Sequence, residues 1–314
     1  MSKDMLITVG AGATSGFASL AFLSGIPGAM LAVYLAPLPL LLVGIDQGIK
    51  AVTISCASGI VTSIIAGNIF FGGLFTIIHA FPAWIIVRQA LLKYSVPGTE
   101  SEAWYPAGSI LCILSVFCAG ILVVTSVWSQ GEAGGLQGLI RSYLDQVFTN
   151  MLPMDEDVQG GLIKLMVPLF PGYMGTSWVL MAVFNASIAL AILKRAKRAE
   201  RPKTKLANLL LPDWISWFII VAASISIFSQ GELEFLSRNL TLILAVPFFF
   251  LGLAVLHNLT NHVTFPRFLL TVFYMALILS GWIALMVTVT GIIEQWFGLR
   301  RHFKKHSLEQ NIND

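Results

Sequence analysis

Charged side chains are scarce in this sequence, since Asp, Glu, Lys and Arg make up only 11% of its 314 residues, against about 25% in an average soluble protein. Hydrophobic residues make up 56%, and the mean hydropathy is +0.81. Nineteen cationic and sixteen acidic residues leave a formal net charge of +3, which is too small to indicate a nucleic-acid binder. The composition therefore indicates a chain that resides in a lipid bilayer.

Cysteine and recognisable catalytic motifs are also rare. Cys56, Cys112 and Cys118 lie inside apolar runs, where an odd number of cysteines is typical of small buried hydrophobes and not of a disulfide framework or a metal site. His302 and His306 have the spacing of a metal pair but no third ligand nearby. The sequence has no phosphate-binding Gly-rich loop, no His-Glu-x-x-His and no Gly-x-Ser-x-Gly. We expect no enzyme activity, no cofactor and no bound metal.

Apolar runs that approach the roughly 20 residues of a membrane helix dominate the chain. Prolines and glycines interrupt them: Pro27 separates the first two runs, Gly67, Gly72 and Gly73 bracket a hinge, and Pro168 and Pro171 are expected to kink or break a long run. The runs cover 5–25, 27–44, 51–67, 73–92, 107–128, 161–193, 213–229, 236–257 and 267–298. We predict an all-α, polytopic membrane protein with eight to ten membrane segments.

The segment 132–160 differs from these runs because it is acidic and only partly apolar. Within it, apolar residues recur every three or four positions from Leu136 to Leu152, while residues such as Asp145 and Asn150 occupy the other side. This pattern predicts an amphipathic helix over 135–152 that lies at the membrane surface.

The distribution of charge predicts the orientation of the chain. Seven of the nineteen cations lie in 194–205 and four in 300–305, and such clusters usually stay in the cytoplasm. We expect both termini in the cytoplasm of a bacterial inner membrane, with the acidic segment outside. A single helix over 267–298 would export the basic tail, so we predict a hairpin that turns near Gly281. The predicted modules are residues 1–130, 131–160 and 161–314.

Polar side chains within the apolar runs are the candidates for ligand binding, because an ionisable group inside a membrane is costly unless it lines a cavity or has a partner. Tyr34, Asn68 and His79 are the candidates in the N-terminal module. For His79, a hydrogen bond to the backbone of another helix is the simpler alternative.

Aromatic and charged residues gather at the predicted cytoplasmic boundary, where an aromatic belt explains most of the tryptophans and tyrosines. Asp213 and Glu294 could also pair with arginines there and close the bundle. The candidates for this interface are Arg88, Trp104, Tyr105, Asp213, Trp214, Glu294, Trp296, Arg300 and Arg301. Gly12 and Gly16 form a separate Gly-x-x-x-Gly face, suited to close packing against a helix of this chain or of a partner.

Four short motifs resemble those of the YybS-like family of uncharacterised bacterial membrane proteins. They are the run from Gly28 through Tyr34, Pro37 and Pro39, the Trp104-Tyr105-Pro106-x-Gly108 motif, the run from Asn239 to His257, and the closing Gly291-x-x-Glu294-x-Trp296 motif with Arg300-Arg301. Glu294 stands where we expect Asp in that family, which preserves the charge. The N-terminal region of the family is similar in pattern to the substrate-binding subunits of energy-coupling-factor vitamin transporters. The resemblance implies an architecture and no particular chemistry.

Two functions remain open. The protein could bind a small hydrophobic or amphipathic molecule, as the substrate subunit of a transporter does, and would then have an open cavity lined by residues such as Tyr34, Asn68 and His79. It could instead be a scaffold for cell-envelope machinery, with a filled core and an exposed small-residue groove for a membrane protein partner. A lipid-modifying enzyme would need carboxylates or histidines clustered at one depth, and the sequence shows no such cluster.

The amphipathic segment gives a test of orientation. Single cysteines at Asp145 and Asn150 should react with a membrane-impermeant thiol reagent in intact cells, because the acidic segment is expected outside. The parent protein, whose three cysteines lie in apolar runs, is the control. Labelling of both positions only after permeabilisation would place the helix in the cytoplasm.

Overall fold

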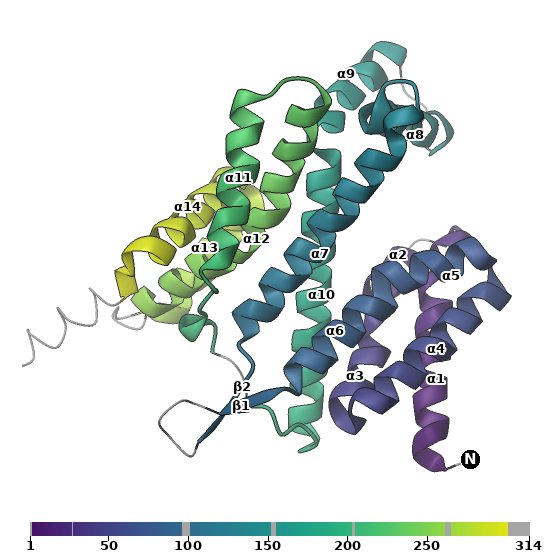
Figure 1. Ribbon diagram of the computed structural model, residues 1–314, viewed down its shortest axis with the longest axis vertical. Coiled ribbons are helices and arrows are strands. Elements are labelled where there is room, and N and C mark those ends of the chain that lie inside the picture. Colours follow the sequence, from purple (N-terminus) through teal and green to yellow (C-terminus); the bar gives the residue numbers. More distant parts are fainter. Residues whose placement is uncertain are drawn as a thin grey trace, which may run out of the picture. The chain divides into compact units, whose positions relative to one another are not determined.

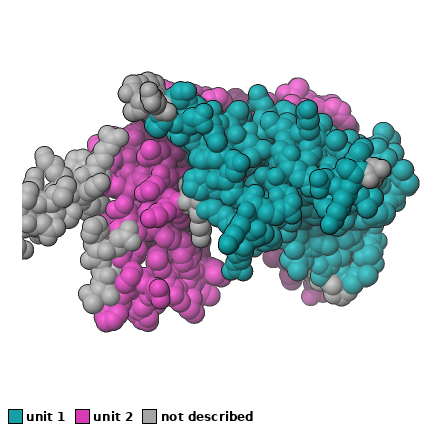
Figure 2. All heavy atoms as spheres, turned by 90° about the horizontal axis from the view of Figure 1, so that it is seen from below, with its two compact units in different colours: residues 1–110, 180–204 teal, residues 111–179, 205–314 magenta. Residues whose placement is uncertain are grey.

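The computed structural model describes residues 2–26, 28–95, 101–151, 155–202, 205–260 and 265–300. These residues are almost entirely helical, with one short β-hairpin (Figure 1). The chain divides into two compact units, coloured separately in Figure 2. Unit 1 contains residues 1–110 and 180–204, and unit 2 contains residues 111–179 and 205–314. The chain therefore enters unit 2 and returns to unit 1 before it completes unit 2. These units do not follow the three consecutive modules expected from the sequence, and those modules stay a prediction.

Unit 1 begins with short helices and ends with the last part of α10. Its elements are α1 (Lys3–Ser19), the 3₁₀ turn η1 (Ala21–Ser24), α2 (Ala29–Leu35), α3 (Pro37–Gln47), α4 (Ile49–Ala66), α5 (Ile69–Phe75), the π-helical turn η2 (Thr76–Ala80), α6 (Phe81–Ala90), β1 (Lys93–Ser95) and β2 (Glu102–Trp104). The two strands are antiparallel, with Lys93 opposite Trp104. Helices α7 (Ala107–Trp128) and α10 (Phe170–Arg195) each have residues in both units.

Unit 2 contains the longest helices. Besides the remainder of α7 and α10, its elements are η3 (Ser129–Gly131), α8 (Gly135–Met151), α9 (Glu156–Met166), η4 (Val167–Leu169), η5 (Leu206–Asn208), α11 (Trp214–Phe228), α12 (Glu232–Thr260), α13 (Pro266–Leu279) and α14 (Gly281–Phe297). Helix α12 packs against both α11 and α14 (Figure 1). The amphipathic α8 contributes Leu144 to a small core with Ile163 and Val167.

Six helices of the described residues are long and apolar enough to cross a membrane, or seven if the bent pair α13 and α14 is counted as one span. This confirms the all-α polytopic class. The expected eight to ten segments are reached only if shorter helices such as α11 are also counted. With 15 residues, α11 is only about 22 Å long, less than the roughly 30 Å of a hydrocarbon core.

Several sequence predictions agree with the helices and others do not. The helix predicted over 107–128 coincides with α7, and the predicted amphipathic helix coincides with α8 up to Met151, while Leu152 lies outside the described residues. The predicted break near Gly281 is confirmed, since α13 and α14 meet at Ser280 with a bend of 116°. The side to which the tail returns stays a prediction.

Two predicted boundaries are wrong. The first run was expected to continue to residue 25, but α1 ends at Ser19, where the Ser19 hydroxyl donates to the Gly16 carbonyl at 2.7 Å. The fourth run was expected to begin at residue 73, but α5 begins at Ile69. It follows the hinge that Gly67, Gly72 and Gly73 were expected to bracket, where the Asn68 side chain accepts hydrogen bonds from the Phe70 and Phe71 amides and caps the helix. A side-chain cap thus fixes the start of α5, whereas α1 ends with the Leu20 backbone amide as its cap.

Proline breaks the long run 161–193 at one place, and a side chain repairs the break. Between α9 and α10 lies η4, which contains Pro168. The Asn239 amide stands between the Pro168 carbonyl and the Gly172 amide: its Nδ2 donates to the carbonyl at 3.0 Å, and its Oδ1 accepts from the amide at 2.7 Å. Asn239 is fully buried. The broken helix thus keeps its backbone groups paired, as a membrane interior requires.

Glycine sets the closest helix contacts in both units. A Cβ at Gly12 or Gly16 of α1 would collide with backbone carbonyls of α4, those of Ser55 and Gly59 respectively. In unit 2 a Cβ at Gly252 of α12 would overlap the Val287 carbonyl of α14, and one at Gly291 would overlap the Phe248 carbonyl. These helices approach at backbone distance because no side chain stands between them.

The α1–α4 contact predicts a selective effect of bulk. Replacing both Gly12 and Gly16 by Leu should lower the melting temperature in detergent, since overpacking costs about 1–3 kcal/mol. Gly10→Leu in the same helix is the matched control, because nothing lies within 4 Å of a Cβ there. Equal melting temperatures for the double variant and the control would mean that α1 does not depend on this contact.

Candidate functional site

The structure places the three candidate ligand residues of unit 1 in different environments. Asn68 is exposed and caps α5. Tyr34 lies on α2 with 42% of its surface exposed, and its carbonyl accepts a hydrogen bond from Asn185 Nδ2 at 2.7 Å. His79 is buried in the π-helical turn η2, with its ring centroid 5.7 Å from that of Phe75. Asn68 therefore has a structural role that accounts for its position in the sequence.

His79 keeps an unusual environment for a polar group. Its Nδ1 has no hydrogen-bond partner in the part of the chain that the structure describes. The hydrogen bond to a neighbouring backbone, which the sequence allowed for, is not made by this nitrogen. The π-helical turn inserts an extra residue into the span 69–90, and such turns often occur at functional positions.

The interface candidates of unit 1 lie around the hairpin and the end of α6. Arg88 lies over the Trp84 ring, with its guanidinium carbon 5.7 Å from the centroid. Lys93 Nζ lies 4.6 Å from the centroid of Trp104. Tyr105 presents its carbonyl to Arg201 Nη2, at 2.8 Å.

Arg201 is a buried residue that the sequence analysis missed. Its Nη1 also donates to the Ala90 carbonyl at the end of α6, at 2.9 Å. Burial lowers the pKa of the Arg201 guanidinium below its usual value, although an arginine stays charged in proteins. Only its place in a basic loop was visible in the sequence, and the other cations of that loop share that place.

In unit 2 the structure brings two of the predicted interface residues together. Arg300 Nε donates to Glu294 Oε1 at 2.7 Å, and both side chains are nearly buried, with 12% and 6% of their surfaces exposed. The same guanidinium donates to the Ala207 carbonyl at 2.7 Å and the Leu209 carbonyl at 2.9 Å. Arg300 therefore joins the end of α14 to the loop before α11.

The remaining interface candidates of unit 2 have weaker contacts. Asp213 accepts a hydrogen bond from Gln295 Nε2 at 3.3 Å, where the sequence suggested an arginine as partner. Trp214 packs edge-on against Phe218, with centroids 5.7 Å apart. Trp296 is 60% exposed, which suits an aromatic belt. Arg301 lies outside the described residues.

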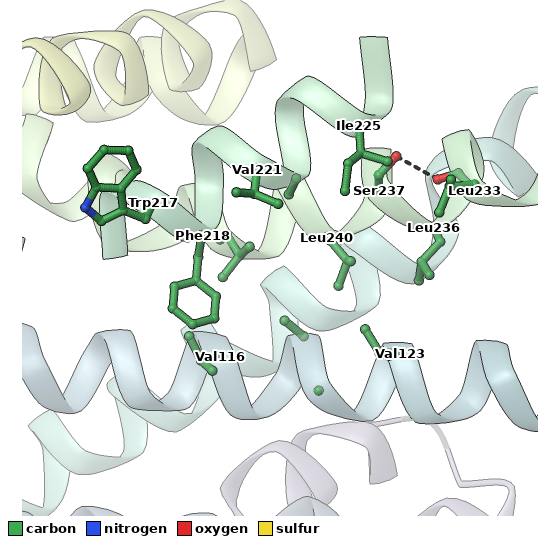
Figure 3. Close-up of a pocket in the computed structure, with 14 residues that line it drawn as sticks. Val116, Val123, Trp217, Phe218, Val221, Ile225, Leu233, Leu236, Ser237 and Leu240 are labelled. Carbon is green, nitrogen blue, oxygen red and sulfur yellow. Dashed lines mark hydrogen bonds between the residues drawn. The ribbon is translucent and has the colours of Figure 1, made fainter. Parts of the chain in front are cut away.

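An apolar groove in unit 2 is the feature best formed to receive a ligand, and the sequence analysis did not identify it. The groove encloses about 500 Å³ between three helices (Figure 3). Its walls come from residues 116–123 of α7, 217–225 of α11 and 233–244 of α12. Trp217 and Phe218 lie toward one end and Leu233 and Ser237 toward the other. The exposed side chains of Trp217, Val221 and Leu233 place the groove at the surface of the unit.

The lining of the groove is almost purely hydrocarbon. Its polar side-chain groups are the Ser237 hydroxyl and the Trp217 indole N–H. The Ser237 hydroxyl lies 2.7 Å from the Leu233 carbonyl of its own helix, to which it donates (Figure 3). Gly120 widens the groove, because nothing lies within 4 Å of a Cβ at this position. No single residue in the sequence signals this groove, since its walls are ordinary apolar positions of three separate helices.

Within the described residues, no group of three or more His, Cys, Asp or Glu side chains could hold a metal ion. Cys56, Cys112 and Cys118 are buried, and all three are free thiols that form no disulfide.

The helices and the groove define a class, the polytopic α-helical membrane proteins. Residues 17–294 match the family described as "Predicted membrane protein (DUF2232)", and the chain belongs to that family. No curated protein and no solved structure matches the chain.

The Glu294–Arg300 pair predicts a strong effect on stability. Arg300→Met should lower the free energy of unfolding by about 3–5 kcal/mol, because it leaves the Glu294 carboxylate buried without its partner. Asp213→Asn, at an exposed hydrogen bond, is the control and should change it by less than about 0.5 kcal/mol. Denaturant titration in detergent measures both values, and similar values for the two variants would contradict the role assigned to the pair.

Proposed function

We propose that this protein is a non-enzymatic component of the bacterial cytoplasmic membrane that binds a small hydrophobic or amphipathic molecule, in the manner of a transporter's substrate-binding subunit. The observation that carries the proposal is the groove between α7, α11 and α12. Its volume of about 500 Å³ falls within the range of about 300–1,000 Å³ for small-molecule sites.

The chemistry of the walls selects the ligand. Since the Ser237 hydroxyl donates within its own helix, the groove has little to offer a polar molecule, and a vitamin-like ligand would lose hydrogen bonds to water without replacement. A hydrocarbon chain has no hydrogen bonds to water to lose, and it gains apolar contacts with the helices that form the groove. The ligand that fits best is therefore an amphipathic molecule whose chain lies in the groove and whose polar group stays outside it.

The groove also lies where such a ligand can arrive. Helices α7 and α12 belong to the candidate membrane spans 107–131 and 232–260, so the groove between them is at membrane depth. A molecule dissolved in the bilayer can enter it sideways without crossing water. This supports binding from the membrane, in place of the open cavity around Tyr34, Asn68 and His79 that the sequence suggested.

The scaffold remains the alternative function, and one observation favours it. Helix α13 has no buried residue, and three of its apolar side chains, those of Phe268, Ile278 and Leu279, are more than two-thirds exposed. A membrane protein partner could cover this helix. The Gly12 and Gly16 face is less suited to that role, because α4 already packs on it.

Orientation is part of the same proposal. The basic segment 194–205 and the acidic segment 132–160 favour cytoplasmic termini, with α8 on the opposite side. The hairpin formed by α13 and α14 agrees with a tail that returns to the cytoplasm.

Gly120→Leu tests the groove directly. The new side chain enters open space and should fill part of the groove without a collision, so the protein should fold normally and bind less ligand. The probe is a palmitic acid analogue that carries a photoreactive diazirine, added to the purified full chain. In the parent protein we expect crosslinks on residues 116–123, 217–225 and 233–244, and in the variant a loss of at least about tenfold, which corresponds to about 1.4 kcal/mol.

Gly73→Leu is the matched control, since Gly73 is also an exposed helical glycine with nothing within 4 Å of its Cβ. It should crosslink as the parent does. Equal crosslinking of the groove in Gly120→Leu and Gly73→Leu, or crosslinks spread over all apolar helices of the parent, would overturn the proposed binding role.

A further inference from the structure

The end of α10 carries the one left-handed backbone conformation of a residue other than glycine among the described residues. Lys197 has a φ of 56°, whereas the other positive φ angles found there belong to glycines. The Arg198 amide donates to the Leu193 carbonyl at 2.8 Å, and the Lys197 amide donates to the Lys194 carbonyl at 3.0 Å. This pair of bonds is a Schellman closure, in which the left-handed position is usually glycine. The left-handed conformation is unfavourable for a lysine, and its presence here suggests that the side chain has a role.

Two neighbouring arginines fix this helix end to the rest of unit 1. Arg198 forms an ion pair with Asp46 at the end of α3. Arg201 is buried and donates to the carbonyls of Ala90 and Tyr105. Both arginines use their guanidinium groups to hold the loop in place, and the cations before them are thereby presented from a fixed backbone.

Three cations remain on the fixed helix end. Lys194, Arg195 and Lys197 form no ion pair with any residue that the structure describes. Arg195 and Lys197 are exposed, and Lys194 is partly exposed. The acidic groups closest along the loop are already engaged, Asp46 with Arg198 and Glu200 with Lys93. The charge of this cluster is therefore open to an external anion.

The position of the cluster identifies the anion. Arg195 is the last residue of the candidate membrane span 156–195, so the three cations lie at the end of that span, where Lys and Arg usually mark the boundary of the membrane. Phosphate groups of lipids lie at that depth, and Lys and Arg side chains at a membrane boundary attract anionic lipids. Charge-assisted hydrogen bonds from ammonium and guanidinium groups to phosphate are short and strong.

We propose that Lys194, Arg195 and Lys197 form a binding site for the headgroup phosphate of an anionic phospholipid. The left-handed Lys197 follows the last helical turn, which carries the other two cations. The site belongs to unit 1 and does not depend on the groove of unit 2.

Lys197→Gly removes the ammonium group and keeps the left-handed backbone, so it tests the side chain alone. Glycine accepts the left-handed conformation freely, so the variant should melt at the same temperature as the parent or higher when no lipid is added. Its affinity for phosphatidylglycerol, measured by native mass spectrometry of the full chain in detergent, should fall about fivefold, the loss that corresponds to about 1 kcal/mol per cation at a membrane surface. Arg195→Gln should lose a similar amount, and binding of phosphatidylcholine should not change in either variant.

Lys164→Gln, in α9, changes the net charge equally at an exposed position of unit 2 and should leave both affinities unchanged. The proposal is overturned if Lys197→Gly binds phosphatidylglycerol as tightly as the parent, or if Lys164→Gln weakens binding as much. It is also overturned if inorganic phosphate at millimolar concentration displaces the lipid completely, because the site would then serve a soluble anion.

Discussion

The requirement that every backbone polar group find a partner inside a bilayer governs the irregular parts of this fold. Where Pro168 interrupts the longest span, the Asn239 amide takes the place of the missing helical bond and ties α12 to α10. The Asn185 side-chain amide likewise donates hydrogen bonds to the carbonyls of Tyr34 and Met181. At the ends of spans the donors are arginines, since Arg201 and Arg300 each donate to two backbone carbonyls. The two fully buried asparagines are thus explained first by the backbone groups to which they bond.

Close packing through glycine accounts for the regular parts. Helix α1 lies on α4 at Gly12 and Gly16, and α14 lies on α12 at Gly252 and Gly291. These contacts leave no room for a ligand, because backbone touches backbone. The groove of unit 2 is different: its walls are side chains, and Gly120 leaves space there that nothing else occupies. The same residue type therefore closes two helix contacts and opens the third, according to what lies opposite.

Binding of an amphipathic molecule and binding of an anionic headgroup rest on separate parts of the chain. The first rests on apolar walls at membrane depth in unit 2, and the second on cations at the end of a span in unit 1. Both are interactions that a membrane supplies without a soluble substrate. The chain belongs to a family of predicted membrane proteins, whose model matches residues 17–294. This membership is consistent with either role and requires neither.

Local signals in the sequence predicted the membrane class, the position of α7, the amphipathic α8 and the break at Ser280, because hydropathy, periodicity and helix-breaking residues act within a few turns of chain. They failed at the end of α1, which stops at Ser19 and not at residue 25. They also did not identify Asn68 as the cap of α5, since many Asn residues could cap a helix and few do. They predicted that Glu294 and Arg300 lie at an interface. They did not predict that these two residues pair with each other and not with Asp213 or Arg88. The partners of Asn239 lie 67 and 71 residues away, and the groove joins three helices that are remote in sequence. Such features depend on which faces meet, and apolar spans of similar composition leave that choice to tertiary packing.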